Sequence, residues 1–151
     1  MILGLVGPYA AGKSTAADHL SSRGFVRIDV DRLGHEALLS HAKTIATVFG
    51  GGVLLHDGGI DRQALGRKVF ADPEALRTLE AIVHPSMRQQ AISQAKSAPR
   101  AVIDAALLFR MHLDEACDHV IWLHSPLLLR LLRAVRRDPR GLRAALQRIR
   151  S

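Results

Sequence analysis

Cysteine is almost absent from this sequence, because Cys117 is the only one in 151 residues. A single thiol excludes an internal disulfide framework and suits a reducing, cytoplasmic compartment. We expect Cys117 to behave as a small buried apolar residue near a strand. No uninterrupted apolar run approaches membrane-spanning length, so we predict no membrane association. The first residues open directly into a predicted strand, and we therefore expect no signal peptide.

Aromatic residues are also scarce, at 4% of the chain, and no known nucleic-acid-binding motif is present. Both observations argue against a nucleic-acid partner, although the basic C-terminal region leaves that alternative open. Apolar residues make up 48% of the sequence, which is enough to form the core of one domain at this length. Oligomeric state cannot be read from these features.

The formal net charge of +7 comes from one end of the chain. Residues 1–125 carry 13 basic and 13 acidic side chains, so they are balanced. The excess consists of arginines opposed only by Asp138, at positions Arg130, Arg133, Arg136, Arg137, Arg140, Arg143, Arg148 and Arg150. A cluster made only of arginine indicates bidentate recognition of phosphate groups, in a nucleotide or a nucleic acid.

The most informative stretch is Gly7–Thr15, which fits the pattern G-x-x-x-x-G-K-[S/T] of a loop that holds nucleotide phosphates. Its two glycines allow a tight turn and leave the backbone N–H groups open to an anion. Lys13 can reach the β- and γ-phosphates, and the Ser14 hydroxyl can bind Mg²⁺. We therefore expect ATP at Gly7, Ala10, Ala11, Gly12, Lys13, Ser14 and Thr15.

The order of predicted elements supports this interpretation. Apolar runs predict strands at 2–6, 25–28, 101–104 and 119–123. Helical periodicity and capping residues predict helices at 14–23, 32–48, 61–70, 72–85, 86–96 and 126–137, with a last helix from Pro139. Strands separated by helices indicate parallel βαβ units. We therefore predict an α/β fold with a doubly wound parallel sheet, in a single domain spanning residues 1–151.

Carboxylates stand at the predicted carboxyl ends of two strands, where such sheets bind their ligands. Asp104 ends an apolar strand, as a Walker-B aspartate that supports Mg²⁺ does. Asp29 and Asp31 follow another strand, and either could accept a proton from an attacking hydroxyl. Helix capping before Arg32 is the alternative role for this pair.

Several further motifs occur in a characteristic order. His35 follows the Asp29–Asp31 pair, Ile60-Asp61-Arg62 precedes Val69-Phe70, and Leu79-Glu80-Ala81-Ile82-Val83-His84-Pro85 precedes Asp104 with Leu107-Leu108-Phe109. Over nearly the whole chain, this series resembles dephospho-coenzyme A kinase. The resemblance implies a P-loop kinase fold like that of nucleoside-monophosphate kinases, with a five-stranded sheet, a helical substrate region at about 32–98 and an arginine-rich lid at about 130–151. It also implies MgATP-dependent phosphorylation of the ribose 3′-hydroxyl of dephospho-CoA.

Residue roles follow from the same resemblance. Asp31 would be the base or hydroxyl-orienting carboxylate, and Lys13 and Arg137 would act on the transferred phosphoryl group. Mobile arginines of the lid (Arg130, Arg136, Arg137 and Arg140) would clamp phosphates, unless they form a solvated basic face. The dephospho-CoA site would include Asp29, Asp31, His35, Arg62, His84, Arg88 and Leu107, and the metal site Ser14 and Asp104. Alternatively, Arg62 and Arg88 are solvated helix charges and His84 caps a helix.

The sequence departs from the family pattern at three places. Arg110 stands where the family has an acid, and the proline that usually follows Asp104 is missing. The phosphate loop reads Gly7-Pro8-Tyr9, where a second glycine is usual, and Val6 replaces a frequent threonine. The third departure is length, because we expect the fifth strand and the closing helix of the family pattern to lie beyond the position of Ser151. The alternatives are a kinase for another small hydroxyl-bearing substrate and a nucleotide-binding module without turnover.

Overall fold

The structure is a computed structural model of the chain, and it describes residues 1–137, with only the backbone of Arg137. The described chain forms two compact units. The first contains Met1–Asp29 together with the chain from Ile92 onward, and it carries the sheet. The second contains Val30–Ala91 and is helical.

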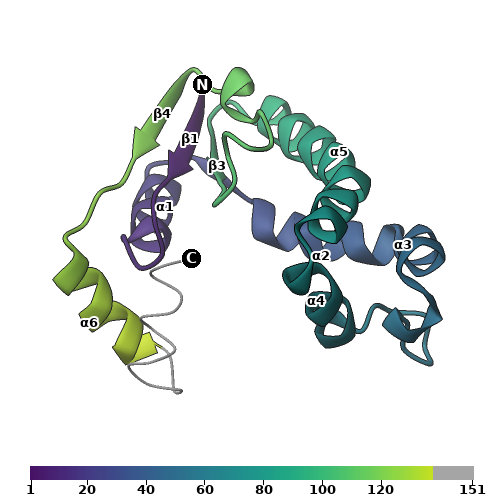
Figure 1. The fold of residues 1–151 in the computed structure, drawn as a ribbon. Coiled ribbons are helices and arrows are strands. Elements are labelled where there is room, and N and C mark those ends of the chain that lie inside the picture. The colour runs from purple at the N-terminus through teal and green to yellow at the C-terminus, as the bar shows by residue number, and fades with distance from the viewer. Residues whose placement is uncertain (138–151) are drawn as a thin grey trace. The chain divides into compact units, whose positions relative to one another are not determined.

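The first unit is built around a four-stranded parallel sheet with the strand order β2-β3-β1-β4 (Figure 1). The strands are β1 (Ile2–Val6), β2 (Val26–Asp29), β3 (Ala101–Asp104) and β4 (His119–Trp122). All four strand predictions are confirmed to within one residue. Hydrogen bonds to β3 on one side and β4 on the other make β1 an interior strand. Both neighbours therefore fix the position of the loop that leaves its carboxyl end.

One face of the sheet packs against α1 (Lys13–Ser22). Leu3 and Leu5 of β1 and Val102 of β3 point to this face and cluster with the fully buried Ala17 of α1. Side chains alternate along a strand, so residues two apart share a face. Burial of each large apolar side chain here stabilises the unit by about 1.5–3 kcal/mol. This packing fixes the position of α1, the helix that follows the phosphate loop.

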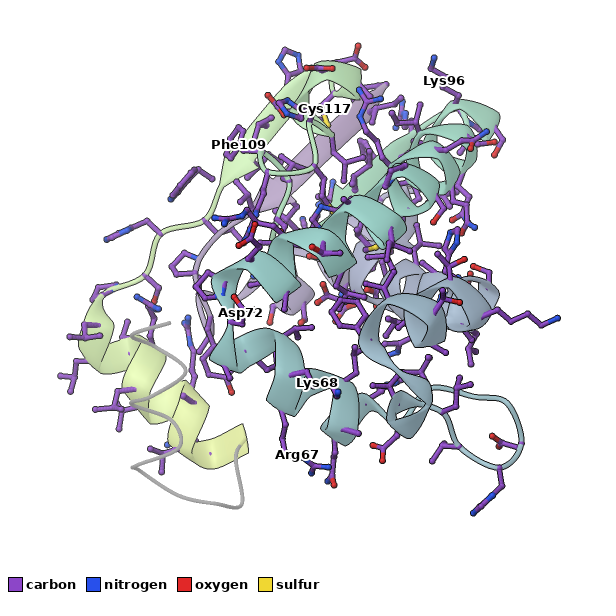
Figure 2. All side chains as sticks on the ribbon, turned by 45° about the vertical axis from the view of Figure 1, so that its right-hand side comes forward. Arg67, Lys68, Asp72, Lys96, Phe109 and Cys117 are labelled. Atoms are coloured by element: carbon purple, nitrogen blue, oxygen red, sulfur yellow. The ribbon has the colours of Figure 1, made fainter. Side chains whose placement is uncertain are left out.

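The segment between β3 and β4 adds further buried residues to this unit. Leu108, Met111 and Leu113 are buried in it, and it contains a short 3-10 helix, η2 (Asp114–Ala116). Phe109 lies beside β4 (Figure 2), and its ring stacks on that of Trp122 with centroids 6.1 Å apart. In the described chain, β4 pairs with β1 alone, and Trp122 is 63% exposed. α6 (Leu127–Arg137) follows β4.

The second unit is made of helices. These are α2 (Val30–Ser40), α3 (Ala42–Phe49), η1 (Gly51–Val53), α4 (Arg62–Ala71) and α5 (Pro73–Ser97), whose last turns beyond Ala91 belong to the first unit. Leu33 of α2, Ile45 of α3 and Val53 of η1 are almost completely buried. An antiparallel bridge between Leu54 and Ile60 closes the glycine-rich segment before α4. This unit therefore has an apolar core of its own.

An aspartate precedes each of the helices α4 and α5. The side chain of Asp61 accepts hydrogen bonds from the backbone N–H groups of Gln63 and Ala64, which confirms it as the N-cap of α4. Asp72 lies at the start of α5 (Figure 2) and accepts one from Glu74 N at 2.8 Å. Each cap satisfies N–H groups that a helix leaves without a partner, and contributes about 1 kcal/mol.

Two helix predictions are wrong. The helix expected at 32–48 is broken at His41, where the chain turns between α2 and α3, and the Ser40 hydroxyl bonds to Ala37 O. The two helices expected on either side of Pro85 are one continuous helix, α5. The Ser86 hydroxyl donates to Val83 O at 3.0 Å and contacts His41 Nε2 at 3.1 Å. Polar contacts therefore support α5 just after the proline, where one backbone hydrogen bond is lost.

The described helices include none that is both long and apolar enough to cross a membrane. The predicted last helix from Pro139, and most of the predicted lid, lie outside the described residues.

Pro85 inside α5 gives a test of helix stability. Pro85→Ala restores an N–H donor toward Ala81 O and is expected to raise the free energy of unfolding by about 1–3 kcal/mol, measured by urea titration. Pro73→Ala is the matched control, because Pro73 is the first residue of the same helix and needs no N–H there. An equal gain in both variants, or a loss in Pro85→Ala, would show that Pro85 is not a source of strain.

Candidate active site

The phosphate loop connects β1 to α1 and has the backbone shape that an anion site requires. Ala10 and Gly12 both have positive φ, of 61° and 108°, and Gly12 is the residue before α1. No side chain caps α1, so no capping side chain takes up the first N–H groups of the helix. Together with the positive end of the helix dipole, these groups form a site for phosphate oxygens.

Gly7 is needed for a reason that the motif alone did not reveal. A Cβ atom at this position would lie 2.6 Å from the backbone oxygen of Leu123, just after β4. The same stretch is tied to β1 by a hydrogen bond from Leu123 N to Val6 O at 2.8 Å. The loop therefore leaves the sheet pressed against the backbone that follows the neighbouring strand.

Lys13 turns back over the loop that it follows. Its Nζ donates a hydrogen bond to Gly7 O at 2.7 Å, and the side chain is partly buried. The ammonium group is thereby held against the first residue of the loop. Ser14 and Thr15, the next two residues, are exposed at the start of α1. Their hydroxyl groups are open to a ligand.

Two arginines of α6 hold the outer side of the phosphate loop. Arg130 Nε donates to Tyr9 O at 2.9 Å, and Arg133 Nη1 donates to Ala11 O at 3.2 Å and to the buried Ser125 hydroxyl at 3.3 Å. Sequence reasoning placed Arg130 in the lid and gave Arg133 no separate role. Their spacing of three residues on a helix, which puts both on one face, was the available signal.

A pocket of about 560 Å³ lies beside the loop. Its volume falls within the range of small-molecule sites. Three of its residues come from the loop, three from α1 and one from α6, namely Ala10, Ala11, Gly12, Thr15, Ala16, His19 and Arg133. His19 and Ala16 were not predicted as site residues. The pocket lies between the predicted phosphate site and the positively charged side chain of Arg133.

Asp104, the predicted metal-supporting aspartate, is buried at the carboxyl end of β3. Its Oδ2 accepts a hydrogen bond from Arg27 Nη2 at 2.5 Å. Among residues 1–137, no three His, Cys, Asp or Glu side chains are arranged to hold a metal. A single carboxylate and the Ser14 hydroxyl fit Mg²⁺, because that ion keeps several waters and takes other ligands from nucleotide phosphates.

Asp29 and Asp31 fall in different units. Asp29 is the last residue of β2 and is aligned with Asp104 of β3. Asp31 is exposed in the first turn of α2, where a negative charge also favours the helix dipole. Leu107 is 41% exposed in the segment after β3. Arg136 is exposed on α6, whereas the side chain of Arg137 and all of Arg140 lie outside the described residues.

The helical unit brings two of the predicted substrate residues together. Arg62 Nη1 and His35 Nε2 are 3.1 Å apart. Arginine has only donors, so His35 Nε2 accepts and the ring carries its hydrogen on Nδ1. His84 and Arg88 lie four residues apart and half-buried in the interior of α5. The alternative in which His84 caps a helix is therefore wrong.

Cys117 is poorly suited to act as a nucleophile. Burial raises the pKa of its thiol to about 11, and the negative charges of Asp114 and Asp118 add to the effect. The thiol also donates to Leu113 O at 3.3 Å. Because the thiolate is the reactive form, Cys117 stays inert at neutral pH. Its place is beside β4 (Figure 2).

Comparison with known proteins adds the family to this geometry. The family model described as dephospho-CoA kinase matches residues 1–151. The chain belongs to the dephospho-CoA kinase family. A dephospho-CoA kinase of Bacillus licheniformis is 39% identical, over 99% of this chain and 78% of the relative. One of Anaeromyxobacter dehalogenans is also 39% identical, over 93% and 70%.

Solved structures agree with this family and with the predicted P-loop kinase fold. A Thermus thermophilus protein superposes with a TM-score of 0.86 at 32% identity, covering 99% of this chain and 78% of the other. A dephospho-CoA kinase of Campylobacter jejuni gives a TM-score of 0.65 at 28% identity, with the same coverage. The sequence predictions of the family, the α/β fold and a kinase are confirmed.

The contact at Gly7 predicts a strong effect of one added methyl group. Gly7→Ala is expected to weaken ADP binding by about tenfold or more, because the backbone after β4 must move away from the loop. Isothermal titration calorimetry measures this. Gly51→Ala, where nothing lies within 4 Å of the added Cβ, should bind ADP like the unmodified chain. Unchanged binding in Gly7→Ala would show that the loop tolerates the displacement.

The arginine contacts of α6 predict a second effect on binding. Arg133→Ala removes a charged donor to the phosphate loop and one wall of the pocket, so we expect about tenfold weaker ADP binding. Arg23→Ala, exposed at the end of α1 and outside the pocket, controls for net charge. Equal losses in the two variants would mean that general electrostatic attraction, rather than the contact with Ala11, is responsible.

Proposed function

We propose that this chain transfers the γ-phosphoryl group of ATP, bound with Mg²⁺, to the ribose 3′-hydroxyl of dephospho-CoA, which gives coenzyme A. The phosphate loop carries the proposal, because it has an uncapped helix, a lysine folded over it and two arginines on its outer side. Membership of the dephospho-CoA kinase family names the acceptor. The single cysteine favours a cytoplasmic location.

The phosphate loop would bind and orient ATP. Backbone N–H groups at the start of α1 would receive the β- and γ-phosphate oxygens, and Lys13 would exchange its bond with Gly7 O for one to a phosphate. Mg²⁺ would supply positive charge against the phosphates, with Ser14 and Asp104 as the chain's own groups near it. The pocket lined by Arg133 and His19 would take part of the nucleoside.

The helical unit would bind dephospho-CoA. Arg62 is held by its contact with His35, which favours a fixed guanidinium suited to a phosphate of the substrate. Arg88 and His84, one turn apart on α5, would add a second polar site on that unit. Asp31 at the start of α2 would accept the proton of the 3′-hydroxyl or orient that hydroxyl.

ADP release in the presence of MgATP and dephospho-CoA tests the proposal. Turnover should require both substrates and disappear in Lys13→Ala. Asp31→Asn is expected to lower kcat by about 10²-fold or more, with little change in KM for ATP, because it removes a proton acceptor. Asp29→Asn, two residues earlier, tests the other candidate base and should lower kcat less than Asp31→Asn does.

The outcomes separate the assignments. A large loss in Asp29→Asn but not in Asp31→Asn would move the base to Asp29 and leave the function intact. Binding of ATP without turnover of dephospho-CoA would favour a nucleotide-binding module. Turnover of another small alcohol in place of dephospho-CoA would show that the acceptor is wrong.

A further inference from the structure

An arginine interrupts the otherwise apolar side of the sheet that faces α1. Arg27 of β2 is aligned with Val102 of β3, which in turn is aligned with Leu3 of β1. Leu3 and Val102 are core residues of this face. A charged side chain at such a position is costly unless its charge is paired. The partners of Arg27 are therefore informative.

Arg27 pairs with two carboxylates of very different exposure. Nη2 contacts Asp104 Oδ2 at 2.5 Å, and Nη1 contacts Asp18 Oδ1 of α1 at 3.0 Å. The side chain of Asp104 is 10% exposed, whereas that of Asp18 is 71% exposed. Water screens the pair with Asp18, so that pair contributes little. The pair with Asp104 is mostly buried, although the Arg27 side chain is 29% exposed, and each charge there affects the other more than in water.

The sheet places a second carboxylate next to this pair. Asp29 of β2 is aligned with Asp104 of β3, and both end their strands. Neighbouring parallel strands bring two acidic residues side by side at the edge that carries the phosphate loop. Within the described chain, Arg27 Nε has no hydrogen-bond partner, so the guanidinium is placed for the carboxylates at its tip. Arg27 supplies positive charge at the carboxyl ends of β2 and β3, where the carboxylates of Asp29 and Asp104 would otherwise be the only charges of the three.

We propose that Arg27 is a positioning residue that sets how strongly the site holds a divalent cation. It occupies Oδ2 of Asp104 and offsets the charge of that carboxylate. The cation is then held by Asp104 only weakly without the phosphates of the nucleotide, and metal and nucleotide bind together. This inference rests on the proposed function, because it assigns Asp104 to the neighbourhood of the metal. Arg27 acts through Asp104 and does not touch the reacting atoms.

Two substitutions separate the charge of Arg27 from its shape. Arg27→Gln removes the charge and keeps a hydrogen-bond donor, whereas Arg27→Lys keeps the charge and loses the planar fork. Asp18→Asn removes the exposed partner without touching Asp104. The readout is the affinity for Mn²⁺, with and without ADP, followed by the electron paramagnetic resonance signal of the free ion. This measurement requires neither dephospho-CoA nor turnover.

Arg27→Gln is expected to bind Mn²⁺ at least about threefold more tightly, and to retain more of that affinity without ADP, because a repelling charge has gone. Asp18→Asn and Arg27→Lys should stay within about twofold of the unmodified chain. Unchanged or weaker Mn²⁺ binding in Arg27→Gln would overturn the proposal. So would a threefold change in Arg27→Lys, because the geometry of the fork would then set the affinity.

Arg27→Gln leaves the buried carboxylate of Asp104 without an opposite charge, so that variant can fail to fold. The Mn²⁺ affinity of Arg27→Lys is then compared with that of the unmodified chain, and a threefold change again overturns the proposal. Failure of the inference is distinct from failure of the proposed function. Normal turnover of dephospho-CoA, with the same Mn²⁺ affinity in Arg27→Gln as in the unmodified chain, overturns the inference alone. Tighter Mn²⁺ binding in Arg27→Gln, with no turnover of dephospho-CoA by the unmodified chain, overturns the proposed function alone.

Discussion

The central position of β1 is the constraint on which the active site depends. Because β1 is hydrogen-bonded to β3 and β4, its carboxyl end cannot move independently of either neighbour. The chain then passes Leu123 O at a distance that only glycine permits. The phosphate loop is therefore shaped by the sheet before any ligand arrives. Preorganised donors of this kind stabilise developing charge without a cost of rearrangement during the reaction.

The contacts around the loop distribute its support over distant parts of the chain. Lys13 bonds to the first residue of the loop, and Arg130 and Arg133 bond to carbonyl groups further along it. α6 is separated from the loop by more than a hundred residues of sequence, yet it belongs to the same unit. A change in α6 can therefore alter phosphate binding without touching the motif. The helical unit has an apolar core of its own, apart from the core that supports the phosphate loop.

Sequence reasoning predicted the features that depend on neighbouring residues. Apolar runs gave the strands, the glycine motif gave the phosphate loop, and Asp61 gave the start of α4. The pattern predicts a helix boundary at Pro85, but α5 continues through it, with the Ser86 hydroxyl bonded to Val83 O just after the proline. Arg27 and Arg133 were missed because their partners lie 77 and 122 residues away. A charged residue between Val26 and Ile28 in a predicted strand was the one local sign of the Asp104 pair.

The raised pKa of Cys117 has a practical consequence for studying motion in this kinase. At neutral pH only about one thiol in ten thousand would be ionised, so maleimide reagents would react slowly with it. Since the sequence contains no other cysteine, a thiol introduced on α6 or in the helical unit could be labelled selectively in the native background. One label in each unit would report whether the distance between the two labels changes when nucleotide is added.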